Sequence, residues 1–88
     1  MDCWTISFSK NAEKQLRKLD KTIQDRILIY LYDRVAYNPK GLGSPLVGNK
    51  TGFWRYRIGD YRVVVELFSQ QLIVEIIRVG HRKDVYEF

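Results

Sequence analysis

Three arginines lie close together in the C-terminal half of the chain, on either side of a short turn. They are Arg55, Arg57 and Arg62, and Gly59 and Asp60 lie between the second and the third. Arginine carries a planar fork of N–H donors, and this fork matches the oxygen atoms of a phosphate group. An arginine cluster of this kind is typical of a site that binds an anion.

The two-residue turn predicts how these arginines are arranged. A loop that opens with glycine favours a type II′ hairpin turn, which pairs Arg57 with Arg62 and Arg55 with Val64. Because side chains alternate along a strand, the three arginines would share one face. Arginines directly opposite each other have Cβ atoms ~5 Å apart and repel. A bound anion would turn this repulsion into a clamp, whereas the alternative is an ordinary charged face that salt screens.

The opposite face of the predicted hairpin is apolar and should be the core face. It would carry Trp54, Tyr56, Ile58, Tyr61, Val63 and Val65. The side on which Arg78 lies stays open, because it depends on the length of the next turn. A three-residue loop after Phe68 would place it beside Arg62 on the arginine face, and a two-residue loop would place it on the core side.

The C-terminal tail holds groups that can carry protons. Residues 80–86 are Gly-His-Arg-Lys-Asp-Val-Tyr. His81 can titrate near neutral pH, and Tyr86 can act as an acid or a base where cations lower its pKa. Arg82 and Lys83 supply such cations. Taken singly, a surface histidine and a packed tyrosine are the ordinary alternatives, but beside the arginine cluster these groups favour catalysis.

Composition limits what such a site can be. The chain has 88 residues and a net charge of +5, so we expect one domain, residues 1–88, with an acidic partner. The single cysteine, Cys3, favours a reducing cytoplasm. We expect no signal peptide and no membrane span. With one histidine and no carboxylate cluster at ligand spacing, we also expect no metal and no cofactor.

Two helices should pack behind the hairpin. A strand is expected over Trp4–Phe8, with Ser9 as the N-cap of a first helix and Asp20 as the cap of a second. The buried stripes are expected to hold Ala12, Leu16 and Leu19 in the first helix, and Ile23, Ile27, Leu31 and Val35 in the second. Asn38-Pro39 should end the second helix, and residues 40–52 should form a loop.

The remaining strands complete an α+β fold. They are expected over Phe53–Ile58, Tyr61–Phe68 and Leu72–Val79, as a three-stranded antiparallel meander. The predicted order is an N-terminal strand, a two-helix hairpin and the meander, with the helices packed on one sheet face.

Two stretches resemble a known family. One runs from Trp54 to Val64 and overlaps the motif GDYRVVVE, which begins at Gly59. The other runs from Ile77 to Tyr86 and contains RVGHRKDVY. Together they look like the RelE branch of the RelE/ParE toxin superfamily, whose order of elements also agrees with the one predicted here. The resemblance covers nearly the whole chain.

The resemblance implies the toxin of a type II toxin–antitoxin pair. Similar proteins are mRNA interferases that cut mRNA in the ribosomal A site without metal, through attack by the 2′-OH and formation of a cyclic phosphate. The resemblance also implies that Arg62 binds a phosphate, that Arg82 stabilises the transition state or leaving group, and that Tyr86 is the general base. His81 occupies a position that is basic in relatives. The residues that we expect to contact RNA are Arg55, Arg57, Arg62, Arg78 and Lys83.

Two features depart from the family pattern. Arg55 and Arg57 stand where the best-known members have lysines, and because arginine stays protonated they can supply charge but cannot shuttle a proton. His81 therefore becomes the more interesting candidate for the general acid. Tyr86 is followed by only two residues, so we expect a catalytic tail that orders when the ribosome or the antitoxin binds.

Two other functions remain open. A ParE-like toxin would poison DNA gyrase by binding and would need no nuclease site, and a binding module or decayed toxin would have no activity. Every version of the toxin implies a RelB-like antitoxin, acidic or amphipathic, that wraps the apolar surface around the helices and covers or distorts the basic face. Leu28 and Tyr32 are candidate contacts if they are exposed, and packing between the two helices is the alternative.

Overall fold

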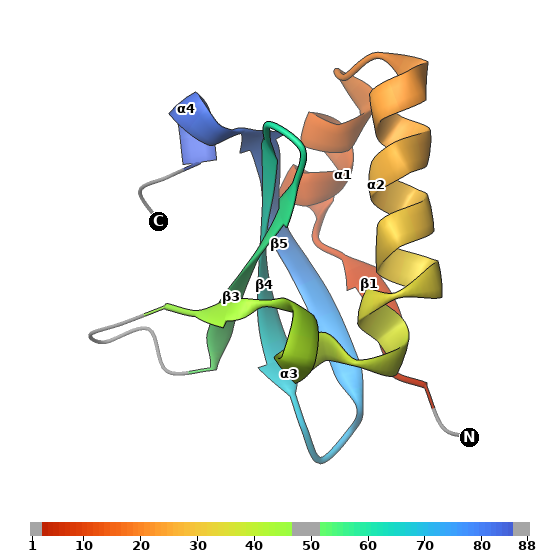
Figure 1. Ribbon diagram of the computed structural model, residues 1–88, viewed down its shortest axis with the longest axis vertical. Helices are drawn as coiled ribbons and strands as arrows, with labels where there is room; N and C mark the ends of the chain where they lie inside the picture. Colours follow the sequence, from red (N-terminus) through yellow and green to blue (C-terminus); the bar gives the residue numbers. More distant parts are fainter. Residues whose placement is uncertain (1–2, 47–51, 86–88) are drawn as a thin grey trace.

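Five strands form one mixed sheet in the order β1-β5-β4-β3-β2 (Figure 1). The computed structural model describes residues 3–46 and 52–85, with the side chains of residues 84 and 85 excepted. The strands are β1 Thr5–Phe8, β2 Ser44–Pro45, β3 Phe53–Ile58, β4 Tyr61–Phe68 and β5 Ile73–His81. The helices are α1 Lys10–Arg17, α2 Lys21–Asp33, the 3-10 turn Val35–Tyr37, α3 Pro39–Leu42 and α4 Arg82–Val85. The predicted α+β class is confirmed.

The N-terminal strand lies at one edge of the sheet, parallel to β5. Thr5 pairs with Ile73 and Phe8 pairs with Ile76. The strand predicted over Trp4–Phe8 is therefore present, and it begins one residue later. This pairing joins the two ends of the chain, which the alternation of residues alone does not reveal.

The two predicted helices cover one face of the sheet (Figure 1). Ser9 caps α1 as expected, since its Oγ accepts a hydrogen bond from Ala12 N at 3.1 Å. Asp20 stands at the N-cap position of α2, but its side chain makes no cap hydrogen bond in the described part of the chain. The buried stripe of α2 is confirmed at Ile27 and Leu31, and Val35 is buried from the 3-10 turn that follows.

The loop expected over residues 40–52 is partly wrong. Asn38 Oδ1 accepts from Gly41 N at 3.2 Å and caps the short helix α3. Pro39 suits the first turn of that helix because this position needs no N–H donor. Strand β2 then pairs with Trp54 and Arg55 of β3. Residues 47–51 lie outside the described residues.

The hairpin of β3 and β4 has the predicted register. Ile58 pairs with Tyr61, Arg57 with Arg62, and Tyr56 with Val63. Gly59 has φ +61°, and Asp60 is not among the residues with positive φ, which agrees with the expected type II′ turn. Because this turn is local, its own residues are sufficient to predict the pairing.

The core lies between the helices and one face of the sheet. The expected core face is confirmed, with Tyr56, Ile58, Val63 and Val65 buried and with Trp54 and Tyr61 packed against them. Within the described residues, no helix is long and apolar enough to cross a membrane. Over the same residues, no group of three or more His, Cys, Asp or Glu side chains forms a metal site.

Tyr56 ties this core to α3. Its side chain is fully buried, and its hydroxyl donates a hydrogen bond to Pro39 O at 2.6 Å. Burial raises the pKa of Tyr56, and the nearby Tyr30 raises it further. In this environment the neutral phenol is therefore strongly favoured over the phenolate.

The substitution Tyr56→Phe is expected to lower the free energy of unfolding by about 1–3 kcal/mol, because the carbonyl of Pro39 loses its partner. The wild type should also lose stability above about pH 10, since tyrosines of the unfolded chain ionise there while folded Tyr56 keeps its proton. This alkaline loss should be smaller in the variant. Urea unfolding at neutral and alkaline pH measures both effects, with the exposed Tyr37→Phe as the control. An equal alkaline loss in Tyr56→Phe would contradict the assignment.

Candidate anion-binding site

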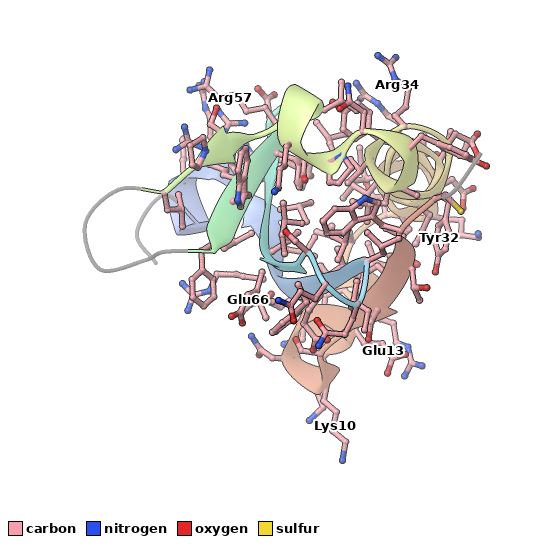
Figure 2. The ribbon with its side chains drawn as sticks, turned by 90° about the horizontal axis from the view of Figure 1, so that it is seen from below. Lys10, Glu13, Tyr32, Arg34, Arg57 and Glu66 are labelled. Carbon is pink, nitrogen blue, oxygen red and sulfur yellow. The ribbon has the colours of Figure 1, made fainter. Side chains whose placement is uncertain are left out.

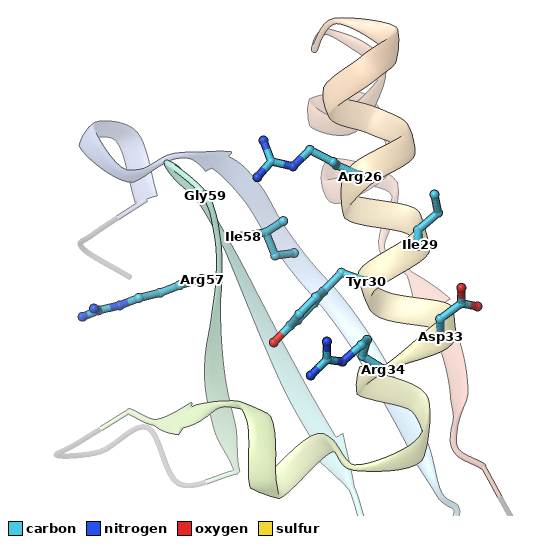
Figure 3. A pocket seen from close by; sticks show the side chains of 8 residues that line it. All are labelled: Arg26, Ile29, Tyr30, Asp33, Arg34, Arg57, Ile58 and Gly59. Atoms are coloured by element: carbon cyan, nitrogen blue, oxygen red, sulfur yellow. The ribbon is translucent and has the colours of Figure 1, made fainter.

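The predicted arginines share the sheet face that points away from α1 and α2. Arg57 lies directly opposite Arg62, and Arg55 lies opposite Val64 in the next row. Figure 2 and Figure 3 show Arg57 extending from β3 on the side away from α2. We call Arg55, Arg57, Arg62 and Arg78 the arginine face. The cross-strand pair that the turn predicted is therefore present.

Arg78 joins this face through an irregularity in β5. The turn after Phe68 has four residues, Ser69 to Leu72, so neither of the two loop lengths considered from the sequence is correct. A four-residue turn alone would pair Arg78 with Val63 of the core face. The register shifts between Val64 and Val65, however, and Arg78 pairs with Val64 instead. Arg55, Val64 and Arg78 thus form one row across three strands.

Val64 is buried although it belongs to the arginine face. Its exposed fraction is 1%, and the flanking residues in its row are Arg55 and Arg78. Arginine side chains bury their aliphatic stems along apolar surface while keeping the charged end in water. Helix α4 also contacts β4 and β5. The base of the arginine face is therefore apolar, which strengthens the field of the charges above it.

Arg62 is the centre of the positive charge. Burial lowers the pKa of Arg62, and the neighbouring guanidinium groups of Arg57, Arg55 and Arg82 lower it further, against a small opposing effect of Asp60. Its Nη1 donates to Tyr61 O at 3.1 Å and to Gly59 O at 3.3 Å, and these bonds hold the side chain at the turn. Arg62 stays charged, and the crowding around it favours an anion.

Arg55 contributes a donor that has no acceptor among the described residues. Its Nε is buried and lacks a hydrogen-bond partner. A buried donor without a partner costs about 1–3 kcal/mol. A ligand oxygen that accepted from Arg55 Nε would remove this cost. The buried Nε is therefore a second observation, beside the opposed pair of arginines, that favours an anion site.

The start of the tail reaches the same end of the sheet. Arg82 N donates to Asp60 O at 2.8 Å, which ties the beginning of α4 to the hairpin turn. Arg82 and Lys83 are both exposed. The start of the tail therefore lies at the end of the sheet that carries the hairpin turn, and the roles of Arg82 and Lys83 stay predictions. Tyr86 lies outside the described residues, so its role stays a prediction.

His81 lies on the other side of the sheet from the arginines. It pairs with Tyr61, which faces the core, and the two rings make an edge contact with centroids 5.6 Å apart. Its Nδ1 accepts a hydrogen bond from Lys83 N at 3.2 Å, which leaves Nε2 as the ring nitrogen that could exchange a proton with a ligand. A proton donated by His81 would therefore be delivered at the end of β5, and its role as general acid stays a prediction.

A pocket of about 480 Å³ lies between α2 and the hairpin, where sequence reasoning placed no site. Figure 3 shows Arg26, Tyr30 and Arg34 pointing from α2 toward the strands. The guanidinium of Arg34 stands 5.7 Å from the ring centre of Tyr30, and that of Arg26 lies against Gly59. The spacing of these three residues, four apart along one helix, was the signal that could have indicated this surface.

Removing one charge from the pair tests whether the face is built for a ligand. We expect Arg57→Gln to stabilise the free protein by about 0.5 kcal/mol at low salt, because it removes cross-strand repulsion, and to weaken RNA binding. High salt should abolish the stability gain. Urea unfolding and RNA titration at two salt concentrations measure both changes. A variant that loses stability at low salt would contradict the repulsion.

Comparison with known proteins identifies the chain. Residues 6–86 match the family model described as the ParE toxin of type II toxin–antitoxin systems, parDE. The chain belongs to this toxin family. It is also 29% identical to Toxin RelG of Mycobacterium tuberculosis over 94% of this chain and 95% of that one, and 30% identical to Toxin RelE of the same organism over 92% and 84%. It is therefore a RelE-like toxin of a type II toxin–antitoxin system.

Solved structures agree with the fold of this toxin. The toxin–antitoxin complex RelBE2 from Mycobacterium tuberculosis matches with a TM-score of 0.86 and 28% identity, over 91% of this chain and 99% of that one. The archaeal RelE–RelB complex from Pyrococcus horikoshii matches with a TM-score of 0.75 and 26% identity, over 91% and 96%. A double mutant of the Escherichia coli RelE toxin in the free state matches with a TM-score of 0.77 at 19% identity, over 96% and 88%, which supports the fold alone.

Proposed function

We propose that this toxin is a ribosome-dependent endoribonuclease that cuts mRNA in the ribosomal A site and so stops translation in the cytoplasm. The observation that carries the proposal is the directly opposed pair of Arg57 and Arg62, with Arg55 in the next row of the same face and Arg82 N bonded to Asp60 O of the turn. Like charges so placed are unfavourable in the free protein and favourable around a phosphate. Arg78 and Lys83 would extend the RNA contact.

The proton transfers can be written with groups of this chain and the 2′-OH of the RNA, while the ribosome presents the mRNA to them. The 2′-oxygen attacks the adjacent phosphorus, the bond from phosphorus to the 5′-oxygen breaks, and the products are a 2′,3′-cyclic phosphate and a 5′-hydroxyl. Tyr86 would accept the proton of the 2′-OH, and the arginines would stabilise the charge on the phosphate oxygens. His81 would donate the proton to the leaving oxygen, because the arginines stay protonated. This step requires the scissile phosphate at the end of β5, near Arg82.

A second candidate function follows from the family model. The model that matches residues 6–86 is described as a ParE toxin, so a gyrase poison that acts by binding alone is the alternative. Such a toxin has no use for a proton donor and acceptor beside the arginine face. The presence of Arg55, Arg57, Arg62 and Arg82 together with Tyr86 in the sequence favours the nuclease.

We also propose a RelB-like antitoxin as the partner. Similar solved structures are complexes of RelE toxins with RelB antitoxins. The net charge of +5 favours an acidic partner. On α2, Ile29 and Tyr32 are 60% and 50% exposed, whereas Leu28 packs against the core. Tyr32 and Ile29 are therefore candidate contacts for the antitoxin, whereas Leu28 packs against the core of the toxin.

A translation assay with defined mRNA separates these functions. The purified toxin is added to programmed ribosomes, and the mRNA ends are mapped and tested for a 2′,3′-cyclic phosphate. The expected result is cleavage within the A-site codon and no cleavage of the same RNA without ribosomes. Intact mRNA together with inhibited DNA supercoiling by gyrase would support the second candidate. If the mRNA stays intact and gyrase stays active, the protein would be a binding module with neither activity.

A further inference from the structure

Strand β5 continues beyond the end of its parallel neighbour. The pairing with β1 stops at Phe8 and Ile76, but β5 runs on to His81. Helix α1 begins at this point and contacts β5 along the stretch that β1 leaves (Figure 1). The backbone groups of this last part of β5 must therefore find partners other than a strand on that side.

Two side chains, one from the N-cap and one from the second half of α1, supply these partners. Ser9 Oγ donates to Ile77 O at 3.3 Å, and Gln15 Oε1 accepts from Val79 N at 2.7 Å. Both bonds are partly buried and join residues more than 60 positions apart in the chain. Ser9 and Gln15 thus act as a substitute for the missing strand, one at each side of Arg78.

The two hydrogen bonds lie at the bulge of β5 and two residues after it. Val65 pairs with Ile76 and Val64 pairs with Arg78, so Ile77 is the extra residue. A regular strand would instead pair Ile77 with Val64 and turn Arg78 toward the core. Because side chains alternate, every residue after the bulge would then exchange faces. The position of Arg78 on the arginine face therefore depends on this bulge.

We propose that Gln15, together with Ser9, is a positioning residue for the phosphate site. The amide oxygen of Gln15 holds the backbone of Val79 in the bulged register, which keeps Arg78 on the arginine face and brings Arg82 to its edge. Gln15 itself does not contact the RNA. This inference rests on the proposed function, because it assigns Gln15 a purpose in RNA cleavage.

A pair of substitutions at Gln15 tests the role. Gln15→Leu keeps the size but removes the acceptor, whereas Gln15→Glu keeps an oxygen at the same reach. We expect about tenfold weaker RNA binding and cleavage in Gln15→Leu, with faster hydrogen exchange at the Val79 amide, and near wild-type values in Gln15→Glu. Gln24→Leu is the matched control, since Gln24 Nε2 donates to Leu19 O at 2.7 Å, away from β5.

The outcomes separate positioning from simple stability. If Gln15→Leu and Gln24→Leu lose RNA binding equally for equal losses of thermal stability, or if Gln15→Glu is as defective as Gln15→Leu, the proposal is wrong. If Gln15→Leu does not fold, Ser9→Asp replaces it, because aspartate keeps the helix cap but cannot donate to Ile77 O.

The result also distinguishes this inference from the proposed function. If the wild type does not cut mRNA, the proposed function fails, but the register can still be followed by NMR. The wild type should show NMR contacts across the pair of Val64 and Arg78. Loss of these contacts in Gln15→Leu, with their retention in Gln15→Glu, would support the role of Gln15 in holding the bulged register. Unchanged contacts in Gln15→Leu would overturn it whether or not the toxin is a nuclease.

Discussion

Replacing Arg62 by glutamine is expected to reduce mRNA cleavage at least about a hundredfold, the usual loss when one well-placed donor to a developing negative charge is removed. Arg62 faces Arg57 directly, burial lowers the pKa of Arg62, and the positive charges of Arg57, Arg55 and Arg82 lower it further. A phosphate bound on the arginine face would therefore contact Arg62 and would lie near several other positive charges. Single-turnover cleavage on programmed ribosomes measures the loss.

The loss should come from the position of this charge and not from net charge alone. Arg17→Gln is the matched control, because Arg17 lies on α1 with a side chain 72% exposed and paired only loosely with Glu13 at 3.6 Å. Both variants lower the net charge by one. Arg62→Gln should also flatten the salt dependence of RNA binding by about 0.7 per lost phosphate contact, whereas Arg17→Gln should leave it unchanged. Equal defects in both variants would mean that the arginine face is only a general positive surface.

Arg62→Lys refines the same prediction. Lysine keeps the positive charge but presents a single ammonium in place of the planar fork. We expect this variant to recover part of the RNA binding and less of the cleavage. Full recovery of cleavage would show that charge alone is sufficient at this position, and it would remove the bidentate contact from the mechanism.

Replacing Tyr86 by phenylalanine is expected to reduce cleavage about a hundredfold or more, which is the usual range for a general base. The substitution removes only the hydroxyl, so RNA binding should stay within about twofold of wild type if the arginines supply the affinity. A large fall in rate with unchanged binding is the behaviour of a group that acts in the transition state. Cleavage rate and binding are therefore measured on the same ribosome complexes.

The control for Tyr86→Phe is Tyr37→Phe. Tyr37 is 55% exposed and belongs to the 3-10 turn on the helix side of the molecule. Unchanged cleavage in Tyr86→Phe would exclude this residue as the base. If toxicity in cells were also undiminished in both Arg62→Ala and Tyr86→Phe, the whole assigned site would be wrong.

The hairpin and the charge on it can be predicted from neighbouring residues alone. The Gly59-Asp60 turn is a local structure, so its residues are sufficient to pair Arg57 with Arg62 and to separate the arginines from the apolar side. The cap of α1 at Ser9 was readable for the same reason, because its partner Ala12 is three residues away. Resemblance to relatives added the expected roles of the tail, which no local rule supplies.

Other positions depend on contacts between distant parts of the chain, and the sequence did not predict them. Arg78 reaches the arginine face because Ser9 and Gln15, far away in sequence, bond the backbone on both sides of it. His81 is turned toward Tyr61 by the same shift in register. A bulge changes the face of every later residue, and the pattern of residues in β5 alone does not specify where a bulge lies. The hairpin was therefore predictable from its own residues, whereas the far end of the site required the contacts of α1 with β5.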